Sequence, residues 1–176
     1  VDDVYRTGVP GVSAVGDVIT SGSRVHPQLA HVSSAEGVLV AERLAGHEVK
    51  PLNFDHVAGC TYCDPEIGSV GLTEAEAKSR GYDVRVGTFP FGVLARAKMA
   101  GETEGFVKIL ADAVDHTVLG VHVIGPWATE LVGEGYLAVN WEATTDDIGR
   151  LVHAHPTLSE LFGETALAFS GRGIHG

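Results

Sequence analysis

Positive charge and cysteine are both scarce in this sequence. Lys and Arg number 12 against 23 Asp and Glu, which leaves a net charge of −11. Proteins that bind nucleic acid or anionic membranes use clustered Lys and Arg, so we expect neither partner. Two cysteines among 176 residues cannot build the disulfide framework of a small secreted domain, and this favours a cytoplasmic protein.

Long apolar runs and targeting signals are missing as well. No apolar run approaches the roughly 18 residues that a membrane-spanning helix needs. A signal peptide would begin with basic residues, whereas this chain begins with Val1, Asp2 and Asp3. Because the sequence also has no starting Met, we interpret it as the C-terminal part of a longer protein.

Hydrophobic residues make up 44% of the chain, which suits a well-packed core, and their pattern changes near residue 50. We therefore expect two parts, residues 1–50 and residues 51–176. In the first part, residues 12–15 suit a short buried strand and residues 27–45 suit a helix. Pro27 is expected in the first turn of that helix, where its missing N–H is not needed.

The second part places short strands before and between helices, in an order typical of an α+β domain. Five segments rich in β-forming residues are expected to be strands: residues 57–63, 67–71, 83–91, 105–112 and 117–124. Capping motifs and apolar periodicity predict four helices, which begin near residues 73, 127, 145 and 157. The short connection between the last two strands predicts a hairpin. The whole pattern predicts an antiparallel sheet covered by helices.

The segment His-Pro-Thr-Leu-Ser-Glu, from His155 to Glu160, is the sharpest chemical feature. A histidine titrates near neutral pH and can pass protons, and a carboxylate bonded to one ring nitrogen fixes its tautomer. Pro156 prevents a continuous helix, so a turn can bring the two side chains together. The alternative is local, because Thr157 and Glu160 also spell a capping box that would occupy the Glu160 carboxylate.

Two other patterns suit metal or redox chemistry less well. His153 and His155 are close in sequence, but no further Cys or His cluster lies nearby, so we expect no metal site. Cys60 and Cys63 form a CxxC pair in a segment expected to be a strand, whereas redox pairs normally sit at a helix N-terminus that activates the thiol. We expect a structural role for these cysteines, with a redox pair as the alternative.

In the first part, Gly16 and Asp17 end a segment rich in small residues. An Asp at the carboxyl end of a strand can accept hydrogen bonds from a ribose or ribityl hydroxyl, and a preceding Gly allows the backbone to approach closely. No GxGxxG motif follows an expected strand, so this chain cannot build a complete dinucleotide site by itself.

Taken in order, these segments resemble one known family, the pyridine nucleotide-disulfide oxidoreductases. The resemblance covers nearly the whole chain and rests on residues 7–17, 28–31, 36–37, 64–74, 96–97, 105–108, 120–125 and 155–160. Each motif is moderately specific, and their ordered combination is strongly so. Within the family, residues 29–31, 64–66 and 155–160 are most similar to the dihydrolipoamide dehydrogenases, with soluble transhydrogenase, glutathione reductase and mercuric reductase as alternatives.

The resemblance implies a fold, an activity and cofactors. Residues 1–50 would be the last segment of an FAD-binding domain, and residues 51–176 would be the dimerisation domain. The longer enzyme would oxidise dihydrolipoamide through an active-site disulfide and FAD, with NAD as electron acceptor. It would be a homodimer that serves the lipoyl domain of a 2-oxo acid dehydrogenase complex, with residues 127–142 and the segment after His155 at the dimer interface.

The resemblance also implies roles for individual residues. His155 would take a thiol proton from the substrate, Glu160 would orient it, and the peptide between His155 and Pro156 would be cis. The expected flavin contacts come from Gly16 and Asp17 at the hydroxyl-bearing side, and from Leu29, Ala30 and His31 at the start of a helix near the ring.

Three departures from the family pattern limit what the chain can do. The CxxxxC motif of the active-site disulfide and both dinucleotide fingerprints are absent. Cys60 and Cys63 are in the wrong place to replace that disulfide. We therefore expect the 176-residue chain alone to have no dihydrolipoamide dehydrogenase activity and to bind FAD weakly or not at all.

Overall fold

The computed structural model of the chain describes residues 1–20 and 25–175. It contains two compact units, Val1–Val57 and Ala58–Gly176. The chain divides after Val57 rather than near residue 50, because the segment that follows residue 50 packs within the first unit. There the ring of Phe54 lies edge-on to that of His26, with 5.7 Å between the ring centroids.

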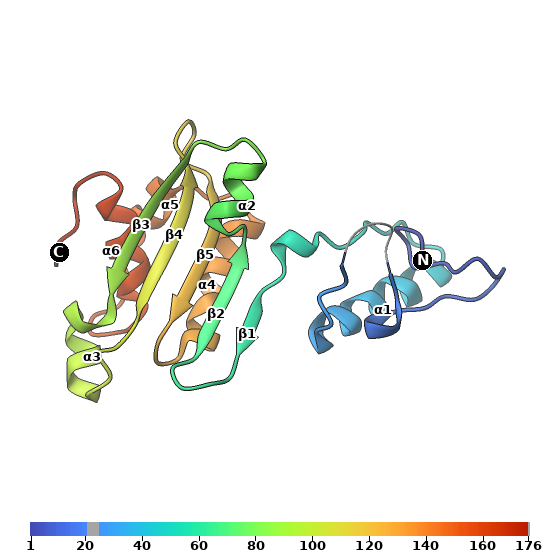
Figure 1. The fold of residues 1–176 in the computed structure, drawn as a ribbon, viewed down its shortest axis with the longest axis horizontal. Helices are drawn as coiled ribbons and strands as arrows, with labels where there is room; N and C mark the ends of the chain where they lie inside the picture. Colours follow the sequence, from blue (N-terminus) through green and yellow to red (C-terminus); the bar gives the residue numbers. More distant parts are fainter. Residues whose placement is uncertain (21–24, 176) are drawn as a thin grey trace. The chain divides into compact units, whose positions relative to one another are not determined.

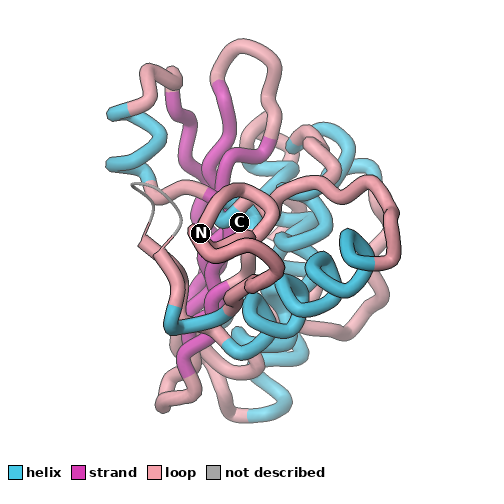
Figure 2. The backbone as a smooth tube through the Cα atoms, turned by 90° about the vertical axis from the view of Figure 1, so that its right-hand side faces the viewer, coloured by secondary structure: helices cyan, strands magenta, loops and turns pink. Residues whose placement is uncertain are grey.

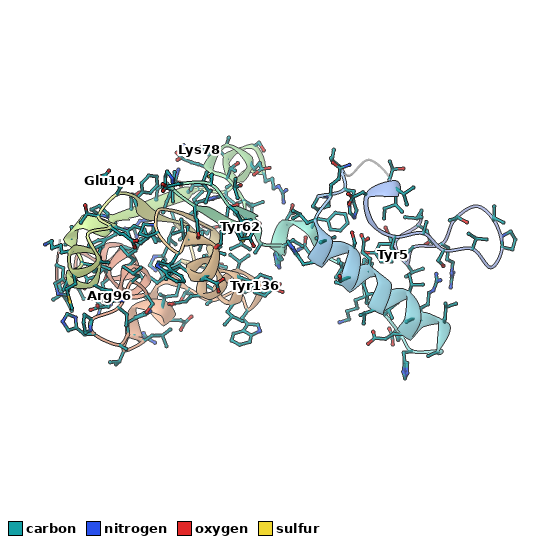
Figure 3. The ribbon with its side chains drawn as sticks, turned by 90° about the horizontal axis from the view of Figure 1, so that it is seen from below. Tyr5, Tyr62, Lys78, Arg96, Glu104 and Tyr136 are labelled. Carbon is teal, nitrogen blue, oxygen red and sulfur yellow. The ribbon has the colours of Figure 1, made fainter. Side chains whose placement is uncertain are left out.

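The first unit is built on one long helix, α1 (Ala30–Leu44), and two short 3-10 helices, η1 (Gly16–Val18) and η2 (Phe54–His56) (Figure 1). The predicted start of α1 at Pro27 is wrong, because Gln28 has a φ of 56°, a left-handed conformation that interrupts a helix. Tyr5, labelled in Figure 3, is buried in this unit.

The buried strand predicted over residues 12–15 is also wrong. Within the described residues, the segment makes only a single bridge, between Ser13 and Arg6, and Val12 is 49% exposed. A strand is stabilised by a hydrogen-bonded neighbour along its length, and one bridge does not supply it.

The second unit contains an antiparallel five-stranded sheet, which confirms the predicted α+β class. Its strands are β1 (Gly59–Thr61), β2 (Ile67–Gly71), β3 (Val84–Pro90), β4 (Phe106–Asp112) and β5 (Val118–Ile124). Their order in the sheet is β1-β2-β5-β4-β3, and β4 and β5 form the predicted hairpin. Seen from the side, the strands form one thin layer (Figure 2).

Two helices pack on this sheet and enclose the core. In Figure 1, α4 (Ala128–Asn140) lies behind β2 and β5, and α6 (Glu160–Ala168) lies behind β3 and β4. The described part of the unit also contains three shorter α-helices and one 3-10 helix: α2 (Glu74–Ser79), α3 (Ala95–Ala100), α5 (Thr145–Arg150) and η3 (Phe91–Val93). The largest fully buried side chains include Phe91, Leu94, Ile109, Leu161 and Phe162. None of the helices formed by residues 1–20 and 25–175 is long and apolar enough to cross a membrane.

Local capping starts two of the short helices. Thr73 and Glu76 form the predicted capping box at α2. At α5 the prediction is one residue late, because Thr144 is the cap and accepts a hydrogen bond from the Asp147 amide at 3.1 Å. Thr145 is instead the first residue of the helix and is buried. A capping residue must leave the helical conformation, as Thr144 does with a ψ of 161°.

Candidate functional site

His155 and Glu160 lie together at the start of α6. The Nδ1 atom of His155 is 2.9 Å from Oε1 of Glu160, and the peptide before Pro156 is cis. The chain turns between them, so the carboxylate at the first position of the helix faces back toward the ring. The His155 side chain is 62% exposed and Glu160 only 11% exposed, which leaves the ring open to a partner while its carboxylate is sheltered.

The Glu160 carboxylate also caps its own helix. Its second oxygen, Oε2, accepts a hydrogen bond from the Thr157 amide at 2.9 Å. The other half of the predicted capping box does not form, because α6 begins at Glu160 with Ser159 as its N-cap, and the Thr157 hydroxyl donates to the Ala154 carbonyl at 2.6 Å. The contact with His155 and the helix cap are therefore not alternatives, since the Glu160 carboxylate uses one oxygen for each.

The charge state of Glu160 fixes the His155 tautomer. Partial burial raises the pKa of the Glu160 carboxyl, but the Thr157 amide and the His155 ring outweigh this and lower the pKa overall. Glu160 is therefore ionised near neutral pH and can only accept hydrogen bonds. Nδ1 of His155 must then donate the proton, and Nε2 of a neutral ring carries the lone pair. Within the described residues, no group is hydrogen-bonded to Nε2.

A second histidine–carboxylate pair lies beside the first. Nε2 of His153 is 2.7 Å from Oε1 of Glu134 on α4. This hydrogen bond raises the pKa of His153, although partial burial opposes the change. In the sequence, His153 stands out only as a weak candidate metal ligand. Glu134 has no signal in the sequence, because a contact between a helix and a distant loop leaves no local pattern.

His153 and Glu160 border a hollow of about 320 Å³ that runs along α6, and Gly163, Glu164 and His175 also line it. Glu164 is nearly buried and accepts hydrogen bonds from the Ile174 and His175 amides at 2.9 and 3.0 Å. Burial raises the pKa of Glu164, but these bonds and the His175 ring lower it overall. Glu164 therefore holds the C-terminal segment against α6.

No metal site accompanies these histidines in the part of the chain that the structure describes. Among residues 1–20 and 25–175, no group of three or more His, Cys, Asp or Glu side chains could hold a metal ion. The His153 ring is hydrogen-bonded to Glu134 instead.

The two cysteines are free and differently placed. Cys60 lies in β1, and its Sγ is 3.8 Å from the Thr129 carbonyl, whereas Cys63 lies beyond the strand with its Sγ 2.9 Å from the Pro65 carbonyl. Partial burial raises the pKa of the Cys60 thiol. A raised pKa disfavours the thiolate that redox exchange requires, so these contacts support a structural role.

The residues expected to contact a flavin come from two segments of the first unit. Gly16 is buried with a φ of 76°, and Asp17 follows it in η1 rather than at the end of a strand. Leu29 precedes α1, which begins at Ala30 and continues with His31, and Leu29 makes no side-chain cap. An exposed carboxylate and a helix N-terminus without a side-chain cap fit the polar groups of a flavin nucleotide.

A buried glutamate joins these two segments. Oε2 of Glu36 accepts a hydrogen bond from the Gly16 amide at 2.7 Å, and Oε1 is 3.0 Å from Nε2 of His26. The His26 ring in turn accepts a hydrogen bond from the Gln28 amide at 3.0 Å. Since Nδ1 of His26 is an acceptor, Nε2 carries the proton and donates to Glu36. In the sequence, Glu36 stands out only as part of a motif, and no local pattern marks His26.

The second unit matches a known domain family. The family model described as the pyridine nucleotide-disulphide oxidoreductase dimerisation domain matches residues 57–166. A dihydrolipoyl dehydrogenase of Bacillus subtilis and the mitochondrial dihydrolipoyl dehydrogenase 1 of Arabidopsis thaliana are each 45% identical to this chain over 175 residues, or 99% of it. Those residues make up 36% and 33% of the two relatives, so the chain spans about a third of their length.

Solved structures share the same architecture. A crystal structure of LpdA from Mycobacterium tuberculosis has a TM-score of 0.85 and 30% sequence identity, over 96% of this chain and 36% of that one. A Cu(II) complex of the flavoprotein disulfide reductase RclA from Escherichia coli has a TM-score of 0.84, over 96% of this chain and 37% of that one. Its sequence identity of 22% supports a shared fold only.

Proposed function

This chain belongs to the pyridine nucleotide-disulphide oxidoreductase family, whose dimerisation domain it contains, and we propose that it supplies the proton-transfer pair of a dihydrolipoamide dehydrogenase. The observation that carries the proposal is the hydrogen bond of 2.9 Å between Nδ1 of His155 and Oε1 of Glu160. It leaves Nε2, on an exposed ring, as the atom that can accept a proton.

The proton transfer follows from this geometry. A dithiol substrate must lose a proton before its sulfur can attack a disulfide, because the thiolate is the nucleophile. Nε2 of His155 accepts that proton, and Glu160 stabilises the resulting imidazolium without itself becoming protonated. The lowered pKa of Glu160 suits this task, because the carboxylate stays ionised near neutral pH.

The 176 residues contain no CxxxxC motif, so the redox disulfide that this pair would serve would have to come from a longer enzyme. FAD would supply the acceptor for the electron pair of the active-site dithiol, and NAD would be the final acceptor. Toward FAD the chain would contribute Gly16, Asp17, Leu29, Ala30 and His31, with Asp17 as an acceptor for a flavin hydroxyl. Residues 1–50 would then be the end of an FAD-binding domain, and we infer that the 176-residue chain alone is inactive.

The proposed enzyme is a cytoplasmic homodimer in which His155 serves the disulfide and flavin of the partner subunit. Several large apolar side chains on or next to α4 support such an interface, because they are exposed on this chain: Trp127, Tyr136, Leu137 and Trp141 (Tyr136 is labelled in Figure 3). Its substrate would be the lipoyl domain of a 2-oxo acid dehydrogenase complex.

Replacement of His155 tests the proposal in a longer protein that contains this chain and binds FAD. His155→Ala should slow flavin reduction by dihydrolipoamide roughly 10²- to 10⁴-fold, because the general base is lost. Stopped-flow absorbance of the flavin gives the rate directly. His116→Ala, which removes another partly exposed histidine, is the control and should retain the rate. A rate that His155→Ala leaves unchanged contradicts the assignment of the base.

A non-catalytic dimerisation module is the second candidate, and the hydrogen bond from the Thr157 amide to Glu160 favours it. Glu160→Gln separates the two, because the glutamine can still accept from this amide but has no charge to stabilise an imidazolium. A slow enzyme with an intact fold supports catalysis, whereas an unaltered rate supports the module. Reduction of glutathione disulfide or of mercuric ion by the longer protein would indicate glutathione reductase or mercuric reductase instead.

A further inference from the structure

The loop that carries His155 has few anchors of its own. It joins α5 to α6, and Leu151 and Val152 at its start are 60% and 98% exposed. The His155 side chain is exposed as well. The His153 side chain, by contrast, is only 12% exposed and is therefore the inward anchor of this part of the loop.

His153 contacts two different helices. Nε2 is 2.7 Å from Oε1 of Glu134, which lies on α4. On the other side the ring lies against Gly163 of α6, where an added Cβ would be only 2.7 Å from Nδ1. Only glycine at this position leaves room for the ring. The ring is therefore held in a slot between a carboxylate on α4 and the backbone of α6.

Electrostatics favour the protonated form of His153 in this pair. Glu134 raises the pKa of His153 above its ordinary value of 6.5, burial opposes this, and the Leu151 backbone and the Glu160 carboxylate act in the same direction as Glu134. Hydrogen bonds between an imidazolium and a carboxylate are shorter and stronger than those between neutral groups. An ion pair of this kind can hold the loop more firmly than apolar contact alone.

We propose that His153 and Glu134 are positioning residues for His155, and that they fix the loop so that Nδ1 of His155 stays bonded to Glu160. This inference rests on the proposed function, in which His155 is the base. His155 is two residues beyond His153, and its own side chain is 62% exposed although it is bonded to Glu160. If the anchor is released, the ring of His155 can turn away and the tautomer with a proton on Nδ1 is no longer enforced.

Nitrogen NMR of the 176-residue chain labelled at histidine tests the proposal without any cofactor. The ¹⁵N shifts of Nδ1 and Nε2 report which nitrogen of His155 carries the proton. In the wild type we expect the Nδ1–H form to dominate. Glu134→Gln should reduce the ratio of Nδ1–H to Nε2–H roughly 2- to 10-fold, as expected when a hydrogen bond of ordinary strength is weakened.

Gly163→Ala is an independent second variant, because it leaves Glu134 in place and displaces the ring sterically. Alanine favours a helix over glycine, so loss of α6 is not expected to account for the change. The same shift of the His155 signal is expected. Asp146→Asn alters another histidine–carboxylate pair, that of His116 at 3.4 Å, and serves as the matched control, which should leave His155 unchanged.

The outcome that overturns the proposal is specific. If Glu134→Gln and Gly163→Ala change the His153 signals but leave those of His155 at their wild-type values, the pair has a structural role only. Failure of the proposed function appears elsewhere, as an unchanged rate in His155→Ala. A wild-type rate in His155→Ala together with a shifted tautomer in Glu134→Gln would mean that His153 and Glu134 position His155, but that His155 is not the catalytic base.

Discussion

Two glutamates in this protein, Glu160 and Glu36, each bond two different groups by using their two carboxylate oxygens separately. Glu160 bonds the His155 ring with one oxygen and the Thr157 amide with the other. Glu36 does the same with His26 and the Gly16 amide. Because a charged acceptor makes stronger bonds than a neutral one, such residues fix geometry as well as contribute stability.

Glu36→Gln should loosen the segment that contains Gly16. The glutamine oxygen can accept from the Gly16 amide, but its NH₂ group would then face the Nε2–H of His26, donor against donor. The cost is about 1–3 kcal/mol, which corresponds to roughly 5- to 150-fold faster exchange of the Gly16 amide hydrogen if it exchanges by local opening. Hydrogen exchange followed by NMR measures this.

Glu42→Gln, on the exposed surface of α1, is the control for that variant. Its Gly16 amide hydrogen should exchange at the wild-type rate. Equal exchange in the two variants would show that the charge of Glu36 does not hold the segment. Because Gly16 and Gln28 adjoin Asp17 and Leu29, a loosened segment should also disturb the expected flavin contacts.

At the scale of elements, α4 has two unlike faces. Toward the sheet it presents small or branched side chains, among them Ala128, Val132, Gly135 and Ala138, all buried. Away from the sheet it exposes Tyr136 and Leu137. The close approach of the helix to β5 depends on Gly135, where an added Cβ would be 2.7 Å from Val121 Cγ1. The helix can therefore lie flat on the sheet while its large apolar residues stay available.

Two glycines of α4 provide a matched pair that tests this. Gly133→Ala adds a methyl group where no atom lies within 4 Å, and we expect it to stabilise the protein by about 0.5–1 kcal/mol through helix propensity. Gly135→Ala gains the same propensity but forces Val121 aside, which typically costs about 1–3 kcal/mol.

Urea unfolding of the two variants gives the difference. Gly135→Ala should be the less stable by about 1–3 kcal/mol, because only this variant is overpacked. Equal stabilities would mean that α4 and β5 are not packed as closely as the structure has them.

At the scale of the whole molecule, the dimerisation domain explains why α4 exposes so much apolar surface. Soluble proteins rarely expose contiguous large apolar patches without a partner. The proposed homodimer would cover Trp127, Leu137 and Trp141, and would present His155 to the partner subunit. Proton transfer by His155 would then depend on formation of the homodimer.

Leu137→Glu should weaken the dimer, because it places a charge among residues that lose water on association. We expect the dissociation constant to rise at least about 10-fold, as for a central apolar interface residue. Sedimentation velocity over a range of concentrations measures it. Val114→Glu, at an exposed site in the β4–β5 turn, should leave the dissociation constant unchanged. A Leu137→Glu variant that dimerises like the wild type would exclude this face of α4 from the interface.

The sequence alone determined the features that depend on neighbours a few residues apart. The capping box at Thr73, the β4–β5 hairpin and the possibility of a contact between His155 and Glu160 all follow from short-range patterns, because backbone sterics and local hydrogen bonds act over one turn. The α+β class follows in the same way, from the order of such elements.

Only the tertiary structure decided which distant side chains meet. The pairs His153–Glu134 and His26–Glu36 join residues 19 and 10 positions apart, and packing of whole elements brings them together. The prediction of a strand over residues 12–15 is wrong because a strand needs a hydrogen-bonded partner strand, which a local sequence pattern does not guarantee. Long-range contacts are selected by burial and close packing, which depend on the entire fold and leave no fixed spacing along the chain.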